Sequence, residues 1–145
     1  DIPVQGAVAI VLTTAARARD LKPRPAYLAG YGQRLAFEVA GRIASLSSYM
    51  EGGRSSAQLT WQRSGFTPKD VDVAQIYDGF SASVIYGLES YGFCNEGEAL
   101  DFIQDGRIEL DGELPLNTFG GSLSTGRIHG LWHIIEGAAS VGTCG

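Results

Sequence analysis

The stretch Leu114–Gly130 reads LPLNTFGGSLSTGRIHG and combines glycines, an amide and ionisable side chains without a strand or helix pattern. Its glycines are Gly120, Gly121, Gly126 and Gly130. Glycine permits positive φ and close backbone approach, and each glycine costs chain entropy that an ordinary connector avoids. The segment therefore indicates a functional site. The alternative is a long surface loop that uses glycine only for its turns.

The composition is that of one globular domain: 145 residues, 44% hydrophobic and 19% charged. No apolar run is long enough to cross a bilayer, and we expect a soluble, cytoplasmic protein. The net charge of −5 argues against a nucleic-acid partner, because phosphate binding needs an excess of Lys and Arg. Cys94 and Cys144 lack metal-ligand spacing and are too few for a disulfide scaffold, so we expect no metal site. The missing initiator Met and the abrupt ends predict a fragment.

Alternating strand and helix patterns predict an α/β fold. The apolar, β-branched run Gly6–Thr13 predicts a strand covered on both faces, and the alternation in Val71–Tyr77 predicts another. Between them, residues 16–20 suit a short solvated helix, and residues 25–32 suit a strand followed by a turn. Residues 35–49 show no clear pattern.

Three longer helices are predicted, at Ser55–Ser64, Phe80–Tyr91 and His129–Val141. Gly65 and Gly92 stand where glycine ends helices. Ser55 or Ser56 is a candidate cap for the first helix, and Asp78 or Ser81 for the second. In the third, Leu131, Ile134, Ile135 and Ala138 are expected to face the core.

Two glycine-containing dipeptides mark an interruption and a turn. Gly52 and Gly53 are expected to break the chain before the first of these helices. Asp105-Gly106, between alternating runs in Phe102–Leu110, predicts a two-residue hairpin turn.

Tyr77 lies where a predicted strand passes into a helix. The carboxyl ends of strands in open α/β sheets are where ligands bind, and helix N-termini favour negative charge. Tyr77 is therefore a second candidate for the site.

Four segments together resemble one known family. Asn117–Gly130, NTFGGSLSTGRIHG, resembles without a gap the pattern N-x-x-G-G-x-x-x-x-G-H-P-x-G of the thiolase superfamily. Gln75–Ser81 resembles the segment that thiolases write N-E-A-F or H-D-C-F. Gly6–Leu21 resembles the last strand and helix of the thiolase N-terminal half, and Phe102–Leu110 a hairpin of lipid-transfer, sterol-carrier-like thiolases.

The resemblance implies the C-terminal half of a thiolase fold, a layered α/β architecture with a mixed sheet flanked by helices. Residues 1–24 would then form the end of the N-terminal half. Residues 25–145 would form the C-terminal domain, truncated before its last strands.

Thiolases make or break the carbon–carbon bond next to an acyl-CoA thioester, using a nucleophilic cysteine, a cysteine base and histidines. The resemblance implies such an enzyme, with a coenzyme A thioester as substrate, a lipid or sterol-derived acyl part and no permanently bound cofactor. Relatives of this type often form homodimers, and several work beside a small OB-fold, zinc-ribbon acyl-CoA-binding protein.

Carried over position for position, the motif's histidine is Arg127 here, and the second oxyanion-hole position is Tyr77. Arg cannot act as a base near neutral pH, but it can donate hydrogen bonds to an oxyanion. The phenol of Tyr77 can donate a hydrogen bond or transfer a proton. His129, two residues on, is a possible substitute for the missing imidazole. The predicted catalytic residues are therefore Tyr77, Arg127 and His129, and the predicted substrate-binding residues are Asn117, Gly120, Gly121 and Gly126.

Each of these residues also has a structural interpretation. Tyr77 would be an ordinary strand-end tyrosine, Arg127 a surface ion pair, His129 a helix cap and Asn117 a support for the loop backbone. His133 is interpreted as structural, and Cys144 as a free thiol in a connector.

The altered positions leave three activities open. The leading interpretation is a thiolase-like acyltransferase. One alternative is retro-aldol cleavage of a β-hydroxyacyl-CoA, in which a tyrosine acid/base suffices. The other is a non-catalytic subunit of the same fold that binds acyl-CoA or lipid. The nucleophilic cysteine of thiolases would lie outside this chain.

Overall fold

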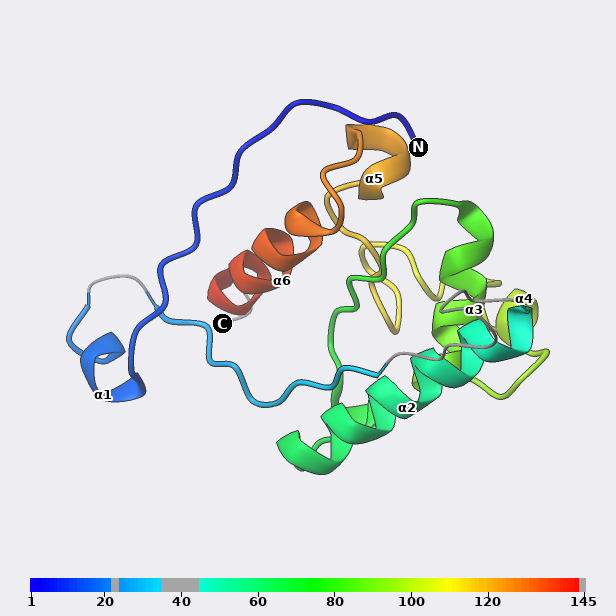
Figure 1. Cartoon of the computed structure of the whole chain (residues 1–145), viewed down its shortest axis with the longest axis horizontal. Coiled ribbons are helices and arrows are strands. Elements are labelled where there is room, and N and C mark those ends of the chain that lie inside the picture. Colours follow the sequence, from blue (N-terminus) through cyan, green and yellow to red (C-terminus); the bar gives the residue numbers. More distant parts are fainter. Residues whose placement is uncertain (22–23, 35–44, 144–145) are drawn as a thin grey trace.

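The structure, a computed structural model, describes residues 1–21, 24–34 and 45–143. Its helical elements are α1 (Ala15–Ala18), α2 (Leu46–Ser64), the short 3-10 helix η2 (Pro68–Asp70), α3 (Ser81–Tyr91), α4 (Ala99–Phe102), α5 (Gly121–Thr125) and α6 (Leu131–Thr143). In Figure 1, α2, α3 and α4 form one group, while α5 lies beside the N-terminus and next to α6. Among the described residues, no helix has the length and apolar character of a membrane span.

A small apolar core joins α3 and α4 to the extended segments that lead into the glycine-rich loop. Its fully buried members are Ala74, Ile76, Leu88, Ala99 and Leu114. Ile76 and Leu114 are close in sequence to Tyr77 and Asn117, so the core supports both sides of the predicted site.

Helix α2 begins well before its predicted start. It begins at Leu46 behind the N-cap Ser45, whose hydroxyl accepts the Ser48 N–H at 3.2 Å. The prediction that Gly52 and Gly53 break the chain is therefore wrong. A Cβ on Gly53 would lie 2.9 Å from Ser90 Cβ, so glycine lets α2 approach α3 closely. This packing offsets a helix-propensity cost of about 1 kcal/mol per glycine.

Helix α3 confirms its predicted range, and Gly92 ends it with φ 88°. The predicted caps are wrong, because the N-cap is Phe80, which makes no side-chain capping bond. The Asp78 carboxylate instead accepts hydrogen bonds from α5, as described below.

The predicted strands are wrong for the described residues. Gly6–Thr13, residues 25–32 and Val71–Tyr77 contain no strand, and the β pairing of the described chain is limited to the parallel bridges Pro3–Arg127 and Ala74–Leu116. The mixed sheet is therefore not confirmed in the part of the chain that the structure describes.

The physical reason is that a strand exists only when neighbours take its N–H and C=O groups. The segment Gly6–Thr13 has no such neighbour in the described chain, and Val11 and Leu12 are 88% and 89% exposed. Its β-branched composition indicates a suitable strand but cannot supply the partner.

The hairpin prediction is half right. Asp105 and Gly106 both have positive φ, 58° and 73°, as a two-residue turn requires. The flanking residues do not pair with each other, since Phe102 ends α4 and the Leu114 N–H donates to the Arg107 carbonyl at 2.9 Å. The residues after the turn, from Arg107 on, instead pair with the segment that leads into the glycine-rich loop.

Helix α6 confirms the third helix, with corrections. His129, with φ 50°, lies before it. Leu131 and Ile134 were expected in the core but are 40% and 55% exposed, and Ala138 is also exposed, while His133 is only 6% exposed. The polar residues His133, Glu136 and Ser140 recur at helical spacing, and this polar side faces inward, so the apolar side that was expected in the core is the more exposed one.

The short helix near residues 16–20 is confirmed as α1, capped by Thr14, whose hydroxyl accepts the Arg17 N–H at 3.3 Å. Residues 35–44 of the unpatterned stretch and Cys144 lie outside the described residues. The division of the chain at residues 24 and 25 stays a prediction.

Candidate functional site

Asn117 fixes the position of the segment that carries Tyr77. Its Oδ1 accepts the Ile76 N–H and its Nδ2 donates to the Ile76 carbonyl, each at 2.8 Å. The Asn117 N–H also donates to the Ala74 carbonyl at 3.0 Å. The residue has φ 49°, a conformation that asparagine tolerates. Its role as a support for the backbone is therefore shown, and a contact with substrate stays a prediction.

Tyr77 lies close against Gly79, and Gly130 is at ordinary contact distance from its ring. A Cβ on Gly79 would stand 2.8 Å from Tyr77 Cε1 and 3.1 Å from its hydroxyl oxygen. A Cβ on Gly130 would stand 3.8 Å from Tyr77 Cδ2. The ring is 37% exposed, so it is held against the backbone yet accessible to solvent.

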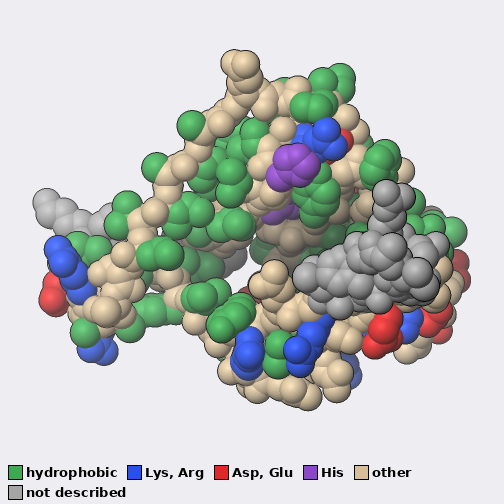
Figure 2. Space-filling view, in the orientation of Figure 1, with side chains coloured by type: hydrophobic (Ala, Val, Ile, Leu, Met, Phe, Trp, Pro, Cys, Tyr) green, Lys and Arg blue, Asp and Glu red, His purple; other side chains and the backbone are tan. Residues whose placement is uncertain are grey.

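Both histidines of the chain lie beside Tyr77. The His129 ring is nearly parallel to it, with centroids 6.4 Å apart and 13° between the planes. The His133 ring is 5.7 Å away and tilted by 53°. Figure 2 shows histidine side chains gathered on one face, next to a cationic side chain. The structure thus brings a phenol and two imidazoles into one cluster.

Asp78 forms a buried pair with His133, the buried imidazole of this cluster. Their side chains are 5% and 6% exposed, with His133 Nε2 3.1 Å from Asp78 Oδ1. The carboxylate also accepts the N–H groups of Ser122, at 2.7 Å, and Leu123, at 3.1 Å. Since a carboxylate only accepts, Nε2 carries the proton of this bond. Nδ1 of His133 is buried and has no hydrogen-bond partner among the described residues.

This pair is what sequence reasoning missed. Asp78 was interpreted as a cap of α3 and His133 as a structural residue. The available signal was an acidic residue directly after Tyr77, together with a histidine one helical turn after His129. Their approach spans 55 positions of sequence, and no local pattern encodes it.

Two glycines of the motif make room for other protein groups. Gly121 has φ 71°, and a Cβ there would lie 2.1 Å from Asp78 Oδ2. Gly126 has φ 91°, and a Cβ there would lie 2.4 Å from Val4 Cγ1. Packing alone thus explains both positions, and the predicted substrate contacts of Gly120, Gly121 and Gly126 stay predictions.

Arg127 is tied to the first residues of the chain. Its Nη1 lies 3.4 Å from Asp1 Oδ1, with side-chain exposures of 29% and 3%. Its backbone N–H donates to the Ile2 carbonyl at 2.8 Å. The backbone nitrogen of Asp1 donates to the Gly79 carbonyl at 3.2 Å, which links Arg127 to the segment behind Tyr77. The side chain is therefore half-buried rather than a free surface cation.

A polar chain connects the loop to α6. Gln75 Nε2 donates to Thr118 Oγ1 at 3.0 Å, and the same hydroxyl donates to Glu136. Together with the Asp78–His133 bond, it explains why the polar side of α6 faces inward.

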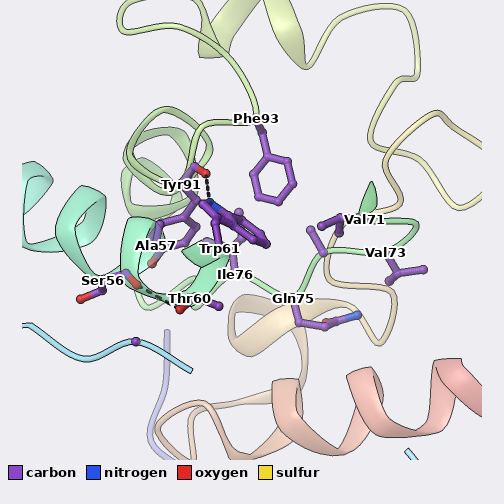
Figure 3. Close-up of a pocket in the computed structure, with 12 residues that line it drawn as sticks. Ser56, Ala57, Thr60, Trp61, Val71, Val73, Gln75, Ile76, Tyr91 and Phe93 are labelled. Atoms are coloured by element: carbon purple, nitrogen blue, oxygen red, sulfur yellow. Dashed lines mark hydrogen bonds between the residues drawn. The ribbon is translucent and has the colours of Figure 1, made fainter. Parts of the chain in front are cut away.

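The described chain also has an apolar pocket of about 360 Å³, shown in Figure 3. Residues of α2, the segment Val71–Ile76, Tyr91 and Phe93 line it. Trp61 lies at its centre and donates from Nε1 to the Tyr91 carbonyl at 3.1 Å. None of the predicted site residues is among the described residues that line it, so the pocket is distinct from the cluster around Tyr77.

The described cysteine, Cys94, lies outside the cluster. Burial raises the pKa of its thiol, and the carboxylates of Glu89 and Glu98 raise this pKa further. The thiol form is therefore favoured over the nucleophilic thiolate.

The chain belongs to the thiolase superfamily, because residues 37–142 match the family described as Thiolase C-terminal domain-like. A solved structure, the Ltp2-ChsH2(DUF35) aldolase, is similar with a TM-score of 0.71 and 36% sequence identity, covering 84% of this chain and 33% of that one. The thiolase-like fold and the resemblance read from the motif are thereby confirmed.

Two curated relatives carry a carbon–carbon cleaving activity in their names. The chain is 46% identical over 136 residues to the 17-hydroxy-3-oxo-4-pregnene-20-carboxyl-CoA lyase of Mycobacterium tuberculosis, covering 91% of this chain and 35% of the relative. It is 39% identical over 135 residues to the steroid side-chain-cleaving aldolase of Thermomonospora curvata, covering 90% and 34%. The chain thus spans about a third of the length of these relatives.

Proposed function

We propose that this chain is part of a lyase that cleaves a β-hydroxyacyl-CoA thioester with a bulky, steroid-like acyl group by a retro-aldol reaction. The observation that carries the proposal is Tyr77, in a position where thiolases have Asn or His, packed against both histidines of the chain. The names of the two relatives support the reaction and the substrate class. Retro-aldol cleavage thus takes precedence over the acyltransferase activity first expected.

The reaction needs no second substrate. A base takes the proton of the β-hydroxyl group, the bond between Cα and Cβ breaks, and Cβ becomes a ketone. The electron pair of that bond forms a thioester enolate, which is protonated at Cα to give the shortened acyl-CoA. The site must therefore exchange protons at two places and stabilise negative charge on the thioester oxygen.

The side chains of the cluster can meet these needs. Tyr77, accessible and held by glycine backbone, is assigned the proton transfer at the β-hydroxyl group. Arg127 is assigned the thioester oxygen, because its ion pair with Asp1 leaves guanidinium N–H donors for an anion. His129, exposed and in left-handed conformation, is assigned the second proton transfer. Asn117, Gly120, Gly121 and Gly126 are assigned to shaping the substrate-binding loop.

Thiolytic cleavage is less favoured by these residues. It requires a thiolate nucleophile and an imidazole at the motif's histidine position. That position is Arg127 in this chain. The competing activities remain distinguishable by experiment.

The test uses the intact protein with two substrates of the same steroid-like acyl group. One is the β-hydroxyacyl-CoA alone, and the other is the 3-ketoacyl-CoA with free coenzyme A. The proposal expects a ketone and a shortened acyl-CoA from the first and no turnover of the second. Thiolysis of the second would restore the acyltransferase interpretation, and tight acyl-CoA binding without turnover of either would indicate a non-catalytic subunit.

We further propose that the protein dimerises and works beside a small OB-fold, zinc-ribbon acyl-CoA-binding protein. The name of the similar solved structure, which pairs Ltp2 with ChsH2(DUF35), supports a two-protein assembly. Light scattering of the intact protein alone tests the dimer. Co-purification with a tagged protein of this kind tests the second partner.

A further inference from the structure

We propose that Asp78 and His133 form a positioning pair that holds the Tyr77 ring in its orientation toward the substrate. The expected effect on turnover rests on the proposed function, whereas the effect on the ring itself does not. Asp78 lies in the segment Gln75–Ser81, whereas His133 lies outside all four segments that carry the family resemblance.

Several elements of the fold meet at Asp78. The residue directly follows Tyr77, its carboxylate accepts two N–H groups of α5, and it binds His133 of α6. The orientation of the segment that carries Tyr77, the glycine-rich loop and α6 therefore depends on one carboxylate. A shift of any of these elements displaces the residue bonded directly to Tyr77.

The His133 ring is held by one hydrogen bond and by an aromatic contact. Its Nε2 has one bond, to Asp78, and its Nδ1 has none among the described residues. The ring also packs edge-on against Phe119, with centroids 4.9 Å apart and 83° between the planes. The hydrogen bond fixes the orientation of the imidazole. The imidazole, whose centroid lies 5.7 Å from that of the Tyr77 ring, in turn limits how the Tyr77 ring can rotate.

The burial of the pair also bears on stability. Burying a charged or polar pair gains little stability over well-packed apolar side chains, because desolvation offsets the attraction. Here both side chains are almost fully buried, in the layer beneath an accessible phenol. A role in orienting Tyr77 accounts for the placement better than stability does.

Two substitutions separate the hydrogen bond from the bulk of the ring. His133→Gln can keep an N–H donor near Asp78, while His133→Phe keeps an aromatic ring and removes the donor. We expect His133→Phe to lower kcat between about 10-fold and about 100-fold with little change in KM, because a small misplacement of a reacting group costs rate rather than binding. His133→Gln is expected to restore most of kcat.

A second measurement does not depend on activity. The intact protein is labelled with 3-fluorotyrosine, and the ¹⁹F resonance of Tyr77 is assigned by its loss in Tyr77→Phe. His133→Phe is expected to move or broaden this resonance, and His133→Gln to leave it in place. If the wild-type protein cleaves no thioester, the proposed function fails while the resonance still tests the pair.

The positioning role is contradicted if His133→Phe leaves both kcat and the Tyr77 resonance unchanged. It is also contradicted if His133→Phe keeps kcat while His133→Gln loses it, because His133 would then only fill space. Should His133→Phe not unfold cooperatively, Asp78→Asn, which keeps the shape and removes the charge, takes its place. An unchanged resonance in that variant would overturn the proposal.

Discussion

The side chain of Asn117 holds Ile76 by both its backbone N–H and its carbonyl group, each at 2.8 Å. The Asn117 side chain thus makes the hydrogen bonds that a neighbouring strand would make, at the residue directly before Tyr77. It explains why a segment without a β-sheet still has a defined position at the site.

Replacing Asn117 should destabilise the protein strongly. Asn117→Ala leaves two buried groups of Ile76 unpaired, and we expect the free energy of unfolding to fall by about 2 to 4 kcal/mol. Asn117→Gly loses the same bonds but tolerates positive φ, so it should be about 1 kcal/mol less damaging than alanine. Urea unfolding measures both. Asn95→Ala, which removes an exposed bond to Glu98, is the control and should change little; equal losses at both positions would contradict the role of Asn117.

Gly121 should not accept a side chain. Gly121→Ala places a Cβ 2.1 Å from Asp78 Oδ2, and the carboxylate cannot move without losing the N–H groups of α5. We expect unfolding to become easier by at least about 3 kcal/mol.

The control is Gly65→Ala, where φ is 76° and a Cβ meets nothing within 4 Å. That variant should lose only about 1 kcal/mol, the cost of positive φ. A thermal or urea unfolding series in which the two variants behave alike would show that Asp78 is free to move.

Alkylation of Cys94 should be slow below its raised pKa. The thiolate is the reactive form, so a raised pKa lowers the reactive fraction at pH 8 relative to the unfolded chain. Iodoacetamide labelling followed by peptide mass spectrometry should give a pH midpoint above that measured in urea. Glu98→Gln removes one source of the shift and should lower the midpoint, while Glu113→Gln, paired with Arg107, should not. A midpoint equal to that of the unfolded chain would refute the shift.

Arg127 should matter through its forked donors as well as its charge. We expect Arg127→Gln to reduce kcat/KM for the β-hydroxyacyl-CoA by about 100-fold or more, with Arg127→Lys intermediate. Steady-state kinetics of the intact protein measure this. Arg54→Gln, which breaks an exposed ion pair with Glu96, is the matched control and should stay within about twofold. An Arg127→Gln variant as active as this control would leave Arg127 with a structural role only.

Local patterns predicted part of the fold. Gly92 ended α3 as expected, and Asp105-Gly106 formed its turn, because both depend on positive φ at one or two adjacent positions. The prediction for Gly53 was wrong because glycine is needed there for the close contact with Ser90 of α3, which the local sequence does not show. The strand Gly6–Thr13 failed because strands depend on partners that composition cannot specify.

The glycine spacing identified the superfamily. Tyr77 stays a predicted site residue, because the strand whose end pointed to it is absent from the described chain. Asp78 and His133 were missed because their contact joins distant segments, and because the polar side of an amphipathic helix is ordinarily expected to face solvent, whereas that of α6 faces inward.

The most direct test of the account is product analysis with the β-hydroxyacyl-CoA, comparing wild-type protein with Tyr77→Phe. The account predicts that the wild type releases ketone and shortened acyl-CoA in equal amounts without added coenzyme A. Tyr77→Phe should bind the thioester normally but react about 100-fold to about 10,000-fold more slowly, as expected for loss of a general acid/base. Unchanged turnover by Tyr77→Phe, or cleavage that requires free coenzyme A, would contradict it.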